Sequence, residues 1–299
     1  MTTRLNGPGA GLGWLTNGFM VAFRHPKPLF GGAALLLVAA ILPSLVTLPM
    51  QLHAMRSGIP QSPAMLGGIM AFSVLYHLLL VPLYAGYLRM VDALERGMPA
   101  SAFGIFDPYR QGDAWRLIGL ALANVGLQVV LFGAIIAAAG GGIISWYVQL
   151  LSAQAAHQQL PALPPGFGTA VALFIVLCLF MMGFYAISLG QVALRQRGVF
   201  GALGDGIVGA LKNLLPLIVY ALSFLLAGIV LLLGFVLVGM VLALLGKLVG
   251  AWLFLALMIP LYIALFLLLL ATMFGVMYYL WRDVCGDGEA PDMEPATAV

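Results

Sequence analysis

The sequence predicts an all-α, polytopic membrane protein with six transmembrane helices. Of its 299 residues, 63% are hydrophobic and only 8% are charged, and the mean hydropathy is +1.09. Soluble globular chains are about 45–50% apolar. The apolar residues fall in uncharged runs of about 20 residues or more, the length that crosses a hydrocarbon core of about 30 Å. The alternating pattern of an outer-membrane barrel is absent.

Six apolar runs define the predicted spans. They are Leu29–Met50, Met65–Met90, Leu117–Ala139, Thr169–Leu194, Leu214–Leu245 and Leu248–Trp281. The last two are longer than the core, so they must tilt, kink at Pro260 or extend past the lipid. Three shorter spans would need turns at Gly234–Gly239 and at Pro260, where no polar residue would place a turn in water. The sequence therefore favours six spans, with further breaks in 214–281 left open.

The basic residues predict the orientation. With both termini in the cytoplasm, eleven of the thirteen Lys and Arg residues lie on that side, and only Arg56 and Lys247 lie outside. Such a bias follows the positive-inside rule. We therefore expect a multi-pass protein of the bacterial inner (cytoplasmic) membrane, with a lead-in and surface helix over 1–28, a transmembrane domain over 29–282 and an acidic, disordered tail over 283–299.

The 140–168 connection contains no Asp, Glu, Lys or Arg. It is predicted to lie at the outer surface, with a short interfacial helix around Ile144–Ala156 followed by a Pro-rich turn.

Two segments predict an internal hairpin repeat. "YAGYLRMVDALERG" (84–97) and "YAISLGQVALRQRG" (185–198) share Tyr-Ala and Arg-Gly at a spacing of 101 residues, and "FRHPKPL" (23–29) echoes "LKNLLPL" (211–217). The unit is a cytoplasmic surface segment followed by a helical hairpin, in two or three parallel copies. Chance similarity between Leu- and Ala-rich segments is the alternative.

The stretch "RGMPASAFGIFDPYRQGDAWRL" (96–117) concentrates charge in a chain that has little. We interpret it as an amphipathic elbow at the membrane surface, in which Ser101 can cap a short helix. Its aromatic residues give it an apolar side, and Asp107, Arg110, Asp113 and Arg116 are expected to stay in water. The elbow is either a plain anchor or a site for anionic lipid headgroups or a membrane-protein partner. The candidate residues for that site are Arg96, Arg110, Arg116 and Trp115.

Catalytic chemistry has no support in the sequence. No His-x-x-x-His or Cys-x-x-Cys pair indicates a metal, and no serine stands in a nucleophile elbow. "GALGDG" (201–206) is interpreted as the turn before a surface helix. We predict no catalytic residue, metal or cofactor, and the formal net charge of +3 argues against a nucleic-acid partner.

Three polar residues are predicted inside the membrane: His77, Asn124 and Gln128. An intramembrane ionisable residue is a functional candidate by default, while Asn and Gln more often join helices by hydrogen bonds. Tyr76, Tyr84, Tyr185 and Ser188 could join them if the helices converge. No Asp or Glu falls at a span centre, which disfavours an ion-coupled carrier.

The segments "GWLTNGFMVAFRHPKPL" (13–29) and "RGMPASAFGIFDPYR" (96–110) carry a resemblance. With them the chain resembles uncharacterised six-span bacterial inner-membrane proteins, near the group related to the membrane domain of glycerophosphodiester phosphodiesterases. The resemblance implies location and architecture. It does not carry the phosphodiesterase activity, because the catalytic domain is missing from this sequence.

Together these observations predict a non-enzymatic envelope protein that binds membrane lipids or a membrane partner. The alternative is a transporter or channel for a small molecule, with a polar path past His77, Asn124 and Gln128.

Overall fold

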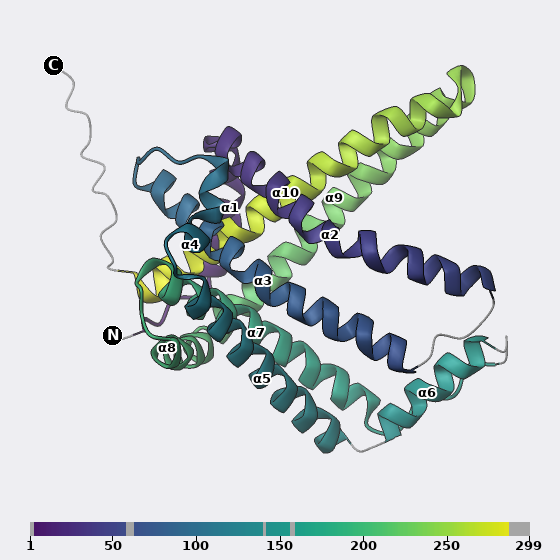
Figure 1. The fold of residues 1–299 in the computed structure, drawn as a ribbon, viewed down its shortest axis with the longest axis horizontal. Coiled ribbons are helices and arrows are strands. Elements are labelled where there is room, and N and C mark those ends of the chain that lie inside the picture. The colour runs from purple at the N-terminus through teal and green to yellow at the C-terminus, as the bar shows by residue number, and fades with distance from the viewer. Residues whose placement is uncertain (1–2, 58–62, 140–141, 156–158, 287–299) are drawn as a thin grey trace.

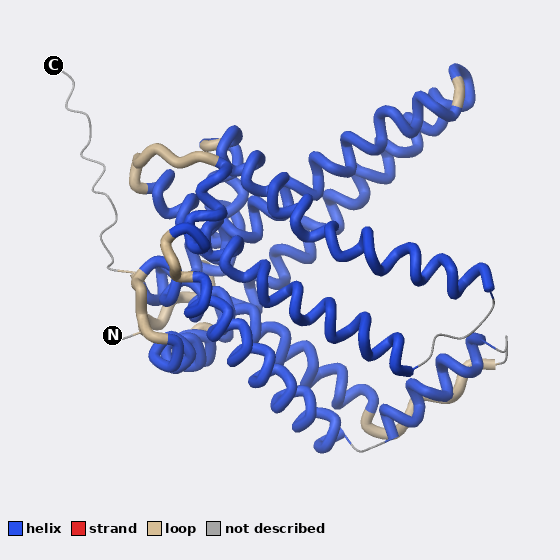
Figure 2. The backbone as a smooth tube through the Cα atoms, viewed as in Figure 1, coloured by secondary structure: helices blue, strands red, loops and turns tan. Residues whose placement is uncertain are grey.

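The computed structural model describes residues 3–57, 63–139, 142–155 and 159–286. Within these ranges the regular structure is helical, without strands (Figure 2). The elements are α1 (Ala10–Arg24), α2 (Pro26–Ser57), α3 (Pro63–Glu95), η1 (Ala102–Phe106), α4 (Asp107–Arg110), α5 (Ala114–Ala139), α6 (Gly142–Ala155), α7 (Phe167–Leu194), α8 (Val199–Lys212), α9 (Leu214–Val249) and α10 (Ala251–Cys285).

Six of these helices are long and apolar enough to cross a membrane: α2, α3, α5, α7, α9 and α10. The prediction of an all-α, multi-pass membrane protein is thereby confirmed. The six helices form three consecutive hairpins, α2–α3, α5–α7 and α9–α10, and α6 lies in the connection where a short helix was expected.

The last two spans are single long helices. α9 has 36 residues and α10 has 35, with Pro260 inside α10. At 1.5 Å per residue each is about 50 Å long, well beyond a core of about 30 Å. α10 also continues through Cys285, so the first residues of the predicted tail are helical. The rest of the tail, 287–299, lies outside the described residues.

One expectation about the surface segments is wrong. "GALGDG" (201–206) is not a turn, because α8 begins at Val199 and runs through it. Its last glycine serves packing: a Cβ atom on Gly206 would overlap the Ser188 hydroxyl on α7. Close contact with α7 therefore outweighs the poor helix propensity of glycine.

Packing is concentrated at one end of the bundle, here called the base, which carries α1, η1, α4 and α8 (Figure 1). The largest fully buried side chains include Trp14, Trp281, Tyr87, Phe184 and Phe274. Away from the base the three hairpins diverge (Figure 1). Large apolar side chains are exposed there, as along the part of α9 from Leu225 to Leu245.

The helices at the base contact one another in a cyclic order. The second helices of the hairpins, α3, α7 and α10, each contact the other two, while α2 contacts α10, α5 contacts α3 and α9 contacts α7. The surface elements follow the same rule: η1 packs on α2 and α3, α8 on α7 and α5, and α1 on α10 and α9. Each surface element thus packs on the preceding hairpin, and α1 closes the ring on the last one.

Two of these contacts require glycine. A Cβ atom on Gly86 of α3 would overlap the backbone carbonyl of Ile105 in η1, and one on Gly11 of α1 would overlap that of Pro216 in α9. The surface elements therefore lie directly against the spanning helices, backbone to backbone.

Candidate functional site

Two arginines of the predicted elbow are accessible to ligand. Arg110 lies on α4 with its side chain 66% exposed, and its nearest partner, Asp107, is 3.6 Å away. Arg96 follows α3 and pairs with Asp92 at 3.0 Å, one turn back on that helix. Exposed pairs of this kind contribute little to stability and release the cation easily. The Arg110 guanidinium can therefore reach a phosphate without breaking a buried contact, and the Arg96 side chain is 57% exposed although its partner Asp92 is only 14% exposed.

Exposed aromatic rings accompany them on every surface element. Trp115, at the start of α5, is 81% exposed, and Phe200, at the start of α8, is 88% exposed. Phe103 in η1 and Phe19 and Phe23 in α1 are exposed as well. Aromatic rings in such positions are typical of a membrane–water interface.

The elbow was expected to gather its aromatic and apolar residues on one side, and it does not. Ile105 is fully buried against α3, whereas Phe103 and Trp115 point away from the protein. Ser101 holds the N-cap position of η1, but its side chain makes no capping hydrogen bond. The elbow is thus fixed by packing of Ile105 rather than by a cap.

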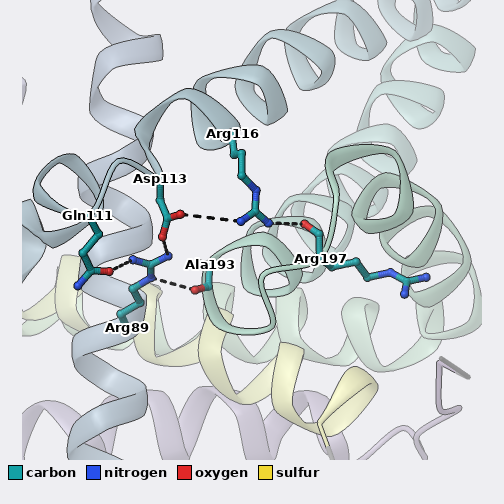
Figure 3. Close-up of polar contacts among 6 residues, drawn as sticks. All are labelled: Arg89, Gln111, Asp113, Arg116, Ala193 and Arg197. Atoms are coloured by element: carbon teal, nitrogen blue, oxygen red, sulfur yellow. Dashed lines mark hydrogen bonds and ion pairs between the residues drawn. The ribbon is translucent and has the colours of Figure 1, made fainter.

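The third predicted arginine, Arg116, lies between protein groups (Figure 3). It donates a hydrogen bond of 2.9 Å to the backbone carbonyl of Arg197 and lies 3.8 Å from Asp113. Its contacts connect α5 with the segment between α7 and α8. Fewer of its guanidinium N–H groups are therefore free to bind a headgroup.

Asp113 is not in water, contrary to expectation. Its side chain is 22% exposed and accepts a hydrogen bond of 2.6 Å from Arg89, which is 19% exposed. Arg89 also donates to the Gln111 side chain and to the Ala193 carbonyl, each at 2.9 Å (Figure 3). This one side chain joins α3, the elbow and α7.

Sequence reasoning counted Arg89 only as a positive charge. The available signal was its position, since it stands inside an apolar helical stretch where a charge needs a partner.

We call each place where a surface segment packs on a hairpin a joint: the elbow on α2–α3, α8 on α5–α7 and α1 on α9–α10. An aspartate connects the two parts at each of these three joints. Asp113 accepts from Arg89, as described above. Asp205 of α8 accepts from Gln191 of α7 at 2.9 Å and lies 2.6 Å from Arg197. Asp283 of α10 accepts from the Trp14 indole of α1 at 2.8 Å. Because hydrogen bonds to a carboxylate are stronger than neutral ones, these contacts fix how the elements meet.

The N-terminal segment adds a further connection at the third joint. The side-chain oxygen of Asn213 accepts from the Asn6 backbone at 2.9 Å, and its amide donates to the Arg4 carbonyl at 2.9 Å. The Arg4 backbone in turn donates to the Val284 carbonyl at 2.9 Å. Residues before α1 thus link the start of α9 to the end of α10.

The predicted intramembrane residues lie on two of the hairpins. His77 of α3 is exposed, with its ring 5.9 Å from that of Tyr84. Asn124 of α5 is buried, 9% exposed, and Gln128 is half-buried one turn further along. The Asn124 side-chain oxygen has no hydrogen-bond partner among the described residues. The structure does not bring His77 into contact with Gln128.

Two of the tyrosine and serine side chains expected near them are already engaged. The Tyr76 hydroxyl donates to the Ala39 carbonyl at 2.6 Å, and the Ser188 hydroxyl donates to the Ala202 carbonyl at 3.2 Å. Tyr185 differs, because its buried hydroxyl has no partner in the described part of the chain.

Tyr109 attaches α4 to the backbone of α3. Its hydroxyl donates a hydrogen bond to the carbonyl of Leu79. Burial raises the pKa of Tyr109 above its usual value, with a smaller contribution from Tyr76, so the hydroxyl stays protonated and able to donate.

An apolar cavity of about 210 Å³ lies at the far end of α5 and α7, beneath α6. Phe132, Ile135, Phe167 and Phe174 are among its lining residues. None of the predicted polar residues lines it, so it does not extend a polar path.

Nothing in the described ranges gathers three or more His, Cys, Asp or Glu side chains that could hold a metal ion. No family model, curated protein or solved structure matches the chain. The class of protein, a multi-pass helical membrane protein, therefore rests on the sequence and the fold alone.

Proposed function

We propose that the chain is a non-enzymatic protein of the bacterial inner membrane that binds anionic lipid headgroups at its base. Arg96 and Arg110 are the headgroup ligands, Trp115 is the interfacial anchor, and Arg116 mainly positions the elbow. The observation that carries the proposal is the pairing of exposed arginines with exposed aromatic rings on the elbow.

Charge distribution supports a base that faces the cytoplasm. Eleven of the thirteen basic residues belong to segments at or beside the base, among them Arg24, Lys27 and Lys212. Cytoplasmic leaflets are anionic, and each basic residue near such a surface contributes about 1 kcal/mol of attraction. The same charges would both orient the protein and concentrate anionic lipid around the elbow.

The geometry supports a headgroup ligand more than a plain anchor. An anchor needs only the aromatic rings, whereas Arg96 and Arg110 also present exposed guanidinium groups, and a phosphate can replace the weak Arg110–Asp107 pair. Arginine binds phosphate with two parallel hydrogen bonds, which a single distant carboxylate does not satisfy. The Arg110–Asp107 separation of 3.6 Å leaves that capacity largely unused.

The test is lipid retention by the double variant Arg96→Gln/Arg110→Gln. Protein is placed in nanodiscs made from mixed phosphatidylglycerol and phosphatidylethanolamine, and bound lipid is measured by mass spectrometry after partial delipidation. We expect the phosphatidylglycerol enrichment of the wild-type protein to fall several-fold. Lys247→Gln is the control, since it removes a charge from the opposite end of the bundle. Equal enrichment in the wild type and the double variant would contradict the proposal.

A transporter or channel is the second candidate, and the buried, unpartnered oxygen of Asn124 favours it. A transport path would make solute flux depend on His77 in reconstituted vesicles. His77→Ala should then abolish flux and leave the thermal stability unchanged. Normal flux in this variant would remove His77 from the path.

We also propose that the three hairpins are copies of one ancestral unit. The cyclic order of helix contacts supports three copies, because surface elements and spanning helices from all three units occupy corresponding positions. The three joints, each with one aspartate, support it further. The relation to six-span proteins near the phosphodiesterase membrane domain stays a prediction.

A further inference from the structure

We infer that the α5–α7 hairpin contains a buried binding site for an uncharged, hydroxyl-bearing ligand between Asn124 and Tyr185. This site is separate from the base, and it does not depend on lipid binding there. Its two defining atoms are the Asn124 side-chain oxygen and the Tyr185 hydroxyl, both buried and both without a hydrogen-bond partner in the described residues.

The register of the hairpin places the two residues at similar depth. The rings of Phe132 in α5 and Phe174 in α7 lie 5.6 Å apart and fix which residues face each other. Asn124 is eight residues nearer the base than Phe132, and Tyr185 is eleven residues nearer than Phe174. The difference of three residues corresponds to about 4.5 Å along the helix axis.

Both side chains also belong to the faces on which α5 and α7 meet. Leu127 of α5 packs in one cluster with Met181 of α7. Asn124 precedes Leu127 by three residues and Tyr185 follows Met181 by four, and residues at these spacings share a helix face. Asn124 and Tyr185 therefore both lie along the α5–α7 contact.

Two orphan polar atoms in this location indicate a missing partner. A buried polar group without a hydrogen bond is costly, and the bilayer core supplies no water to compensate. Tyr185 lies within electrostatic range of Tyr84, which in turn is near His77. Together these side chains form a small polar region that reaches the exposed His77.

The chemistry of the two atoms defines the ligand class. The Asn124 oxygen accepts a hydrogen bond, and the Tyr185 hydroxyl can donate one, so a single hydroxyl group can satisfy both by donating to one and accepting from the other. Asn124 is eleven residues, about 16 Å, from Asp113 at the base. A charged group would find no counter-ion at this depth, which excludes phosphates and ammonium groups.

A hydroxyl group could come from a neutral membrane lipid or from a free polyol, and the experiment separates the two sources. Protein in nanodiscs is exposed to a photoreactive diacylglycerol and, in parallel, to the same lipid with its hydroxyl acetylated. In proteoliposomes, glycerol entry is followed by light scattering. The variants are Tyr185→Phe, which removes one oxygen atom, and Asn124→Leu.

The control variant is Tyr87→Phe. It deletes the same atom from a tyrosine whose buried hydroxyl already donates to the Leu29 carbonyl at 2.9 Å. This change should reduce stability without affecting the ligand.

A lipid ligand should cross-link about fivefold more than its acetylated form, since each hydrogen bond contributes about that factor. Asn124→Leu should remove the difference, because it deletes the acceptor for the ligand hydroxyl. Tyr185→Phe should lower cross-linking of the unmodified lipid about fivefold, and Tyr87→Phe should change neither quantity. A polyol ligand should instead give glycerol entry that the same two variants reduce. If neither cross-linking nor glycerol entry depends on Tyr185 or Asn124, the inference is wrong. Tyr185→Phe alone decides the question if Asn124→Leu fails to fold.

Discussion

Replacing Arg89 with methionine should destabilise the protein by about 3 kcal/mol. The change keeps most of the apolar stem and removes three hydrogen bonds, of 2.6–2.9 Å, to Asp113, Gln111 and Ala193. Breaking a fully buried ion pair costs about 3–5 kcal/mol because the remaining charge is left unpaired. Both partners keep about one fifth of their surface in solvent, so we take the lower end of that range.

The measurement is reversible unfolding by sodium dodecyl sulfate in mixed micelles, followed by tryptophan fluorescence. Arg110→Met is the matched control: its ion pair is mostly exposed, so it should cost no more than about 0.5 kcal/mol. The double variant Arg89→Met/Asp113→Asn should be more stable than the sum of the single effects predicts, because Asp113→Asn removes the unpaired charge. A cost for Arg89→Met equal to that of Arg110→Met would refute the role assigned to Arg89.

Three further changes test the joints and the elbow in the same assay. Gly86→Ala should cost at least about 2 kcal/mol, because its methyl group overlaps the η1 backbone; Gly119→Ala, which meets open space, should not, and equal effects would contradict the close contact. Trp14→Phe should cost about 1–3 kcal/mol through loss of the hydrogen bond to Asp283; an unchanged unfolding midpoint would show that this joint does not hold α1. Tyr109→Phe should cost about 1 kcal/mol at neutral pH. Because the pKa of Tyr109 is raised in the folded protein, its contribution is complete below about pH 10 and is lost as the pH rises further; a wild-type advantage that stays constant up to about pH 11 would argue against this.

The cyclic arrangement gives the N-terminal residues a structural role. α1 packs on α9 and α10, and the residues before it bond to Asn213 and Val284. The first surface element therefore stabilises the last hairpin, although the two are distant in the sequence. The outer part of that hairpin has no comparable support, since the most apolar stretches of α9 and α10 contain no buried residues.

Much of the elbow was predictable, and the reason is compositional. Charged and aromatic residues beside an apolar run can only lie at the membrane surface, so the exposed Trp115 and Arg110 follow from the sequence. The partners of the buried polar side chains could not be predicted from the sequence. Asp113 resembles any other polar residue of the elbow until α3 places Arg89 beside it, and nothing local distinguishes Tyr185 from Tyr76 until one hydroxyl is found without a partner.

The sequence by itself determined the class of protein, the number of spans and the position of the surface segments, because burial in lipid requires long apolar helices and excludes charge from them. Only the tertiary structure decided that the hairpins close into a ring at the base and diverge beyond it. That outcome depends on contacts between residues far apart in the chain, such as Trp14 with Asp283 and Gly86 with Ile105. Hydropathy is a property of each segment alone, whereas packing depends on which segments meet.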